Sequence, residues 1–205
     1  MRTQRFFAAL LVALMLSALG SIAPQPAAAA ADIPVTMFFT ATVDQVRDFH
    51  YVLNVKPGDT ITGTYTYNAA AVNTSKLSGA GSYLNKTAPY GLHLYVGNTV
   101  IETDPQNVHV GMYITNNLYG ADSYMVSRKN NRPIPGLWDI TALSWGLYDP
   151  TMTALKNVNL TKTAPTLSDW LQDADSGLEV QGVDLVPNSE YRLLLRAHVT
   201  SVRKI

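Results

Sequence analysis

The chain has 205 residues, with 15 Lys and Arg against 15 Asp and Glu and no cysteine, so its formal net charge is zero. This balance excludes the basic surface of a nucleic-acid-binding protein and the polybasic patch of a membrane-surface protein. With 47% hydrophobic and 15% charged residues the chain is too apolar to be disordered, and the lack of cysteine excludes disulfides and thiol chemistry.

The N-terminal segment has the three parts of a secretory signal peptide. Arg2 and Arg5 form a short basic start, residues 6–19 are almost wholly apolar, and a run of small residues follows. The apolar run is shorter than the roughly 20 residues that span a bilayer, and no other stretch is apolar enough to do so. We therefore predict a signal peptide over residues 1–31 and one domain over 32–205, secreted or periplasmic and without a membrane span.

The rest of the chain alternates between apolar and polar residues with a period of two. Successive side chains of a strand point to opposite faces, so this pattern predicts half-buried antiparallel strands. In 60–67, for example, four threonines alternate with Ile, Gly and two Tyr, after a Pro-Gly-Asp turn. Residues 68–86 and 129–136 are interpreted as exposed loops. The predicted strands are 35–43, 60–67, 92–96, 99–102, 108–115, 122–128, 143–148, 177–184 and 191–202.

The pattern predicts only one short helix, over 166–171, where Thr166 offers a capping residue. Without longer helices nothing can carry parallel crossovers, so we expect antiparallel pairing throughout. The fold class predicted is all-β: a two-sheet antiparallel β-sandwich, jelly-roll-like, with about nine or ten strands and one short helix. Trp138, Trp145 and Trp170 are expected to pack in its core.

Six segments of strand and turn residues follow one another along the expected mature chain. They are 39–43 (FTATV), 55–68 (VKPGDTITGTYTYN), 91–98 (GLHLYVGN), 122–126 (DSYMV), 147–155 (LYDPTMTAL) and 164–170 (APTLSDW). In order and spacing they resemble a group of exported bacterial β-sandwich proteins, many of which carry a C-terminal PEP-CTERM sorting signal. The resemblance implies the sandwich fold but no assigned reaction or catalytic residues. No Pro-Glu-Pro signal follows Val202, so we expect free secretion.

The usual catalytic patterns do not occur. There is no Gly-x-Ser-x-Gly motif, the four histidines are not spaced as a metal-binding pair, and the three glutamates form no local pair such as a glycosidase would need. We therefore predict that the protein is not an enzyme. The alternative is a carbohydrate-active enzyme on a jelly-roll scaffold, with carboxylates that converge only in the folded chain.

An acidic segment is the one candidate for a cofactor. Asp173, Asp175 and Glu179 are spaced loosely as in a calcium loop, with Gly177 allowing a tight turn. The alternative is a solvated loop without a bound ion. No other cofactor is expected.

Two predicted strands suggest a ligand-binding patch. His93 and Tyr95, and likewise His109 and Tyr113, lie opposite the apolar side chains of their strands. If the two strands are neighbours, these four side chains form a flat exposed patch on which sugars could stack. The alternative is that loops cover them or that they support cross-strand pairing.

The sequence thus predicts a secreted, non-catalytic protein, a structural or binding component of the cell envelope or extracellular matrix. Its expected partners are extracellular polysaccharide or envelope proteins, and not nucleic acid.

Overall fold

Antiparallel strands dominate the structure, a computed structural model that describes residues 31–171 and 176–205. Within these residues there are ten strands and one short 3-10 helix. They are β1 (Pro34–Arg47), β2 (Thr60–Asn68), β3 (Ala80–Asn85), β4 (Gly91–Val96), β5 (Thr99–Glu102), β6 (His109–Leu118), β7 (Ala121–Lys129), β8 (Trp138–Asp149), η1 (Leu167–Asp169), β9 (Gly177–Asp184) and β10 (Arg192–Lys204). The all-β prediction is confirmed, and each predicted strand corresponds to one of these elements.

Strand β3 was not predicted, because the interpretation of residues 68–86 as an exposed loop is wrong for their last part. β3 pairs with β6, and alternate β3 residues Gly81, Tyr83 and Asn85 are buried. The period-two pattern is weak here because Gly and Asn are poor strand formers. Pairing with an apolar neighbour outweighs that local preference.

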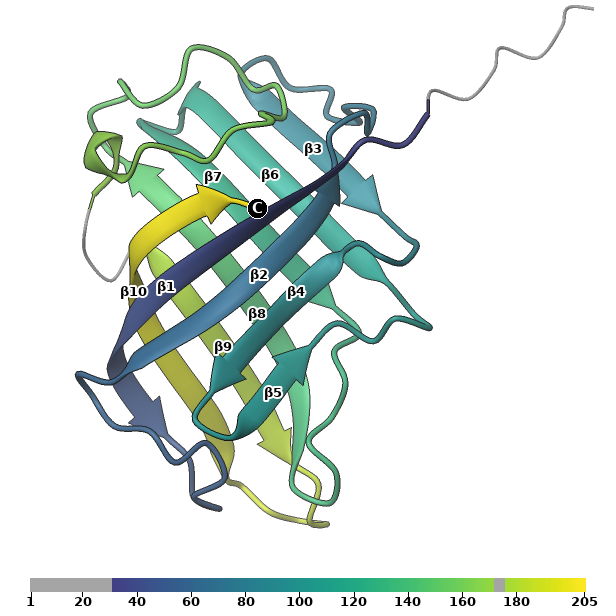
Figure 1. The fold of residues 1–205 in the computed structure, drawn as a ribbon, viewed down its shortest axis with the longest axis vertical. Helices are drawn as coiled ribbons and strands as arrows, with labels where there is room; N and C mark the ends of the chain where they lie inside the picture. Colours follow the sequence, from purple (N-terminus) through teal and green to yellow (C-terminus); the bar gives the residue numbers. More distant parts are fainter. Residues whose placement is uncertain (1–30, 172–175) are drawn as a thin grey trace, which may run out of the picture. The chain divides into compact units, whose positions relative to one another are not determined.

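All ten strands belong to one sheet in the order β3-β6-β7-β8-β9-β10-β1-β2-β4-β5. The two-sheet, jelly-roll-like sandwich is therefore not confirmed. The link between the two parts is the pairing of β10 with both β9 and β1. Figure 1 shows how the sheet curls so that β10, β1, β2, β4 and β5 lie across the remaining strands. We call these five strands the β1 half and the other five the β7 half.

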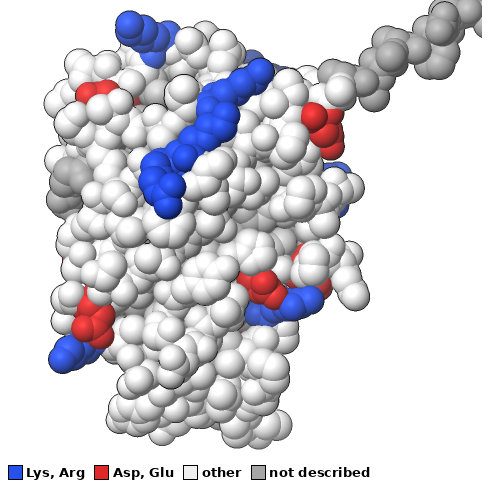
Figure 2. All heavy atoms as spheres, in the orientation of Figure 1, with Lys and Arg blue, Asp and Glu red and all other residues white. Residues whose placement is uncertain are grey.

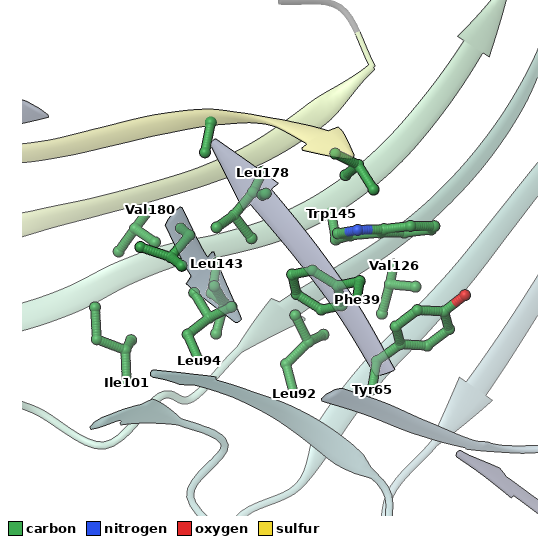
Figure 3. Packing of buried hydrophobic residues seen from close by; sticks show 14 of the residues in the cluster. Phe39, Tyr65, Leu92, Leu94, Ile101, Val126, Leu143, Trp145, Leu178 and Val180 are labelled. Carbon is green, nitrogen blue, oxygen red and sulfur yellow. The ribbon is translucent and has the colours of Figure 1, made fainter. Parts of the chain in front are cut away.

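The hydrophobic core lies between the two halves, on the concave side of the curled sheet (Figure 3). The centroid of the Trp145 ring, from β8, lies 5.8 Å from that of the Phe39 ring of β1 and 4.8 Å from that of the Tyr65 ring of β2. Trp138 and Trp170 are buried as well, so the predicted core role of all three tryptophans is confirmed. Burial of such large aromatic surfaces stabilises the packing of the halves against each other.

A glycine in β2 allows this close packing. A Cβ atom on Gly63 would lie 2.5 Å from Phe39 Cζ and 2.7 Å from the backbone oxygen of His93. Any larger residue would push Phe39 out of the core or separate β2 from β4. The glycine of the alternating segment 60–67 therefore sits where the core leaves no room for a side chain.

The free end of β5 is tied to the segment that follows β7. Thr103 forms an isolated bridge with Asn131, and the backbone amide of Arg132 donates a hydrogen bond of 3.0 Å to the backbone oxygen of Glu102. These contacts join the two halves at one edge and place the Arg132 side chain beside β5. As for membranes, none of the helices in the described ranges is both long and apolar enough to cross a bilayer.

Candidate functional site

The four residues of the predicted aromatic patch lie on two strands that are far apart in the sheet. His93 and Tyr95 belong to β4, which pairs with β2 and β5, whereas His109 and Tyr113 belong to β6, which pairs with β3 and β7. All four face away from the core, as expected from the alternation. Since β4 and β6 are not hydrogen-bonded neighbours, the structure does not bring the four together as one patch.

Tyr113 on β6 has a local packing role. The Tyr113 ring lies over Gly111, where an added Cβ atom would come within 2.6 Å of Tyr113 Cε2 and of its hydroxyl. Met125 on β7 is the cross-strand partner of Tyr113. Aromatic side chains that cover a strand glycine and a neighbouring apolar residue stabilise the pairing of strands. For Tyr113 the contact agrees with the alternative of cross-strand packing, while ligand binding by the four residues stays a prediction.

The predicted calcium ligands are only partly covered by the structure. Asp173 and Asp175 lie outside the described residues. Glu179 lies on β9 and accepts hydrogen bonds from Arg196 Nε, at 2.8 Å, and from the Gln181 side chain. No group of three or more acidic, His or Cys side chains in the described part of the chain is placed to hold a metal ion. Calcium binding at this segment stays a prediction.

His93 and Tyr95 take part in two parallel rows of outward-facing side chains that cross all five strands of the β1 half. The first, which we call the charged row, consists of Arg203, Phe38, Thr64, His93 and Glu102, from β10 to β5. The second, the hydroxyl row, consists of Ser201, Thr40, Thr62, Tyr95 and Val100 in the same strand order. With strands about 4.8 Å apart, each row is about 19 Å long, and the rows are about 7 Å apart.

Contacts with Glu102 hold one end of the charged row in place. His93 Nδ1 lies 3.0 Å from Glu102 Oε2, and Arg132 Nη1 donates a hydrogen bond of 2.6 Å to Glu102 Oε1. Both oxygens of this one carboxylate are therefore engaged. At the other end of the row, the Arg203 guanidinium lies over the Phe38 ring, with Cζ 4.9 Å from the ring centroid. Such cation–π contact orients the guanidinium without using its N–H donors.

Hydroxyl groups form a short network in the hydroxyl row. Thr40 Oγ1 lies 2.7 Å from Ser201 Oγ and 2.8 Å from Thr200 Oγ1. Tyr95, at the other end, has 51% of its surface exposed. The row thus combines an ordered set of hydroxyl donors and acceptors with one exposed aromatic face.

A small pocket opens beside the His93–Glu102 pair. It has a volume of about 160 Å³, and its walls are His93, Glu102, Ala88, Pro89, Tyr90, Thr103 and Pro105. That is roughly the volume of five water molecules. Burial and the neighbouring Asp32 raise the pKa of Tyr90 to about 12, so its phenol stays protonated at neutral pH. The pocket has mainly apolar walls with a few convergent polar groups, as small-ligand sites have, but it is smaller than the roughly 300–1,000 Å³ typical of them.

A wider depression of about 530 Å³ lies at the end of β1 and in the segment that leads to β2, beside the exposed Tyr51. Its acid Asp48 already accepts hydrogen bonds from Trp138 Nε1 at 3.1 Å and from the Leu53 amide at 2.8 Å. Nearby, the pKa of Asp184 is lowered mainly by a hydrogen bond from the Ser189 side chain and also by one from the Val186 amide. Both Asp48 and Asp184 are therefore engaged in holding loops.

Apart from His93 and Tyr95, the members of the two rows were not predicted as site residues from the sequence, and neither was Arg132. The alternation of 35–43 does place Phe38 on the outward face, and this was the available signal. Its pairing with Arg203 depends on the register of β1 and β10, in which Thr40 and Thr200, for example, are 160 positions apart in the chain. No local pattern reports that register.

The comparisons with known proteins gave no match: no family model, no curated protein and no solved structure matches this chain. Function is therefore inferred from the geometry of the chain itself.

Proposed function

We propose that this chain is a secreted, non-catalytic binding protein of the cell envelope or extracellular matrix that holds a polysaccharide on the outer face of its β1 half. The ligand lies along the charged and hydroxyl rows, and one of its sugar units or substituents enters the pocket beside His93. The observation that carries the proposal is the combination, on one face, of that pocket with the exposed Tyr95 ring and a row of hydroxyl groups.

The chemistry of the face suits sugars. A pyranose ring has apolar C–H faces that stack on aromatic rings, and hydroxyl groups at its rim that exchange hydrogen bonds with Thr, Ser and His side chains. The hydroxyl row offers Thr40 and Thr62 on neighbouring strands next to Tyr95. A row that is about 19 Å long can contact several sugar units of a chain at once.

The chemistry of the pocket favours binding over catalysis. Glycoside hydrolysis needs two carboxyl groups about 5–9.5 Å apart across the bond that is cleaved. Glu102 is the one carboxylate among the residues that line the pocket, and His93 and Arg132 engage both of its oxygens. A carboxylate held in this way is poorly suited to act as general acid or nucleophile. The resemblance to PEP-CTERM-associated exported proteins stays a prediction.

Affinity electrophoresis of the purified protein through gels that contain soluble polysaccharides tests the proposal. We expect retardation by at least one polysaccharide, and Tyr95→Ala to weaken binding about tenfold, the effect of about 1.4 kcal/mol. Tyr113→Ala is the matched control, because Tyr113 is also an outward-facing, exposed tyrosine in the middle of a strand but lies on the β7 half. Equal loss in both variants, or no retardation by any polysaccharide, would contradict the proposal.

A further inference from the structure

The candidate face has a cationic group at each end of its charged row. Arg203 lies at the β10 end and Arg132 at the β5 end, beside Glu102. The four strand spacings from β10 to β5 separate the two ends of the row by about 19 Å. Any linear ligand that lies along the row therefore passes both guanidinium groups.

Both arginines have donors to spare. None of the ion pairs among the described residues includes Arg203, and its guanidinium rests on the Phe38 ring. Arg132 uses Nη1 for Glu102, and 53% of its side-chain surface is exposed. A guanidinium has five N–H donors in a planar fork, so each arginine can still bind a carboxylate or sulfate in a bidentate manner.

The one acid of the row does not oppose such binding strongly. Glu102 is neutralised by Arg132 and contacts His93, so the row as a whole has an excess of positive charge through Arg203. Figure 2 looks at this side of the molecule and shows a continuous band of Lys and Arg atoms near the end of β10, whereas acidic atoms are confined to a few separate places. The face thus differs from the balanced charge of the whole sequence.

We propose that the ligand of this face is an acidic polysaccharide, whose carboxylate or sulfate groups pair with Arg203 and Arg132 while the sugar units between them lie on the threonines and Tyr95. This inference rests on the proposed function and adds the charge class of the ligand. Neutral polysaccharides lack a partner for the two guanidinium groups. They would leave Arg203 and Arg132 to water, and so gain less from the same contacts.

The test compares polysaccharides that differ only in charge. Binding of the purified protein to polygalacturonate, alginate and hyaluronan is measured by calorimetry at low and moderate salt, each beside its carboxyl-esterified neutral form. We expect at least one acidic form to bind ten times more tightly than its neutral form, and this ratio to fall as salt rises. Monomeric galacturonate, which cannot reach both arginines, should bind far more weakly than the polymer.

Variants assign the effect to residues. Arg203→Gln and Arg132→Gln should each reduce the preference for the acidic form several-fold, and Arg192→Gln should not. Arg192 is the matched control, since it is an exposed arginine at the far end of the same strand as Arg203. Melting curves of all three variants verify that they fold.

The outcomes separate the two proposals. Equal affinity for the acidic and neutral forms, lost in Tyr95→Ala, would overturn the charge preference and leave the proposed function standing. Absence of binding to every polysaccharide would overturn both. Equal affinity for double-stranded DNA, unaffected by Tyr95→Ala, would show a response to charge alone and overturn the assignment of the ligand as a polysaccharide.

Discussion

Asp122 and Asp149 lie directly opposite each other on β7 and β8, and both carboxyl groups are buried. The two carboxylates accept hydrogen bonds from different backbone amides. Asp149 accepts hydrogen bonds from the amides of Thr151 at 2.8 Å and Thr153 at 2.8 Å, and Asp122 from that of Leu155 at 2.8 Å. The two acids thus fold the loop after β8 back onto the sheet.

This arrangement predicts that Asp149→Asn destabilises the protein. The amide of asparagine keeps one acceptor oxygen, so some of the part-buried hydrogen bonds from residues 151–154 are lost. We expect the melting temperature to fall by on the order of 5 °C or more. Asp139→Asn is the control, because Asp139 lies on the same strand with an exposed side chain. A fall of the same size in both variants would show that the loop contacts are not the cause.

The same residue predicts a dependence of stability on pH. The hydrogen bond from the Thr151 hydroxyl, with those from backbone amides, holds the pKa of Asp149 well below its usual range. A carboxyl group with a lowered pKa in the folded state stabilises that state fully above its unfolded pKa of about 4, and this contribution is lost as the pH falls further. We therefore expect the difference in melting temperature between wild type and Asp149→Asn to be constant from pH 7 to pH 5 and to shrink below about pH 4. Thermal melts across this range measure it, and a difference that stays constant down to pH 2 would contradict the assignment.

The close contact at Gly63 predicts the effect of a single methyl group. Gly63→Ala should cost about 1–3 kcal/mol, because the new Cβ atom would collide with Phe39 and with the backbone of β4. Gly146→Ala is the matched control in β8, since its nearest neighbour would be the backbone oxygen of Tyr124 at an ordinary 3.5 Å. Urea denaturation measures both. If Gly63→Ala proves as stable as the control, the packing of Phe39 against β2 is looser than described.

Much of the local structure could be predicted, because a period-two pattern depends only on neighbouring residues. The alternation correctly predicts that His93, Tyr95, His109 and Tyr113 face outward. It failed for β3, where Gly and Asn weaken the pattern, and it could not distinguish one curled sheet from two stacked sheets. In both architectures each strand has one apolar face toward a shared core.

The candidate site depended more strongly on contacts between distant parts of the chain. His93 is paired with Thr64 and Glu102 rather than with residues of β6, so only half of the predicted patch stays together. Arg132 reaches Glu102 because the segment after β7 bonds to the end of β5. Each of these pairings follows from strand order, which the alternation of side chains leaves open.

By itself the sequence determined which side chains face the core and which face solvent, since that follows from the geometry of an extended chain with apolar residues at every second position. The tertiary structure alone decided which outward-facing residues meet, because β1 and its partner β10 come from distant parts of the chain and are neighbours only in the folded sheet. The pairing of Thr40 with Ser201, separated by 161 positions, is the clearest case. Such contacts are selected by the fit of the whole core, and no local stretch of residues contains that information.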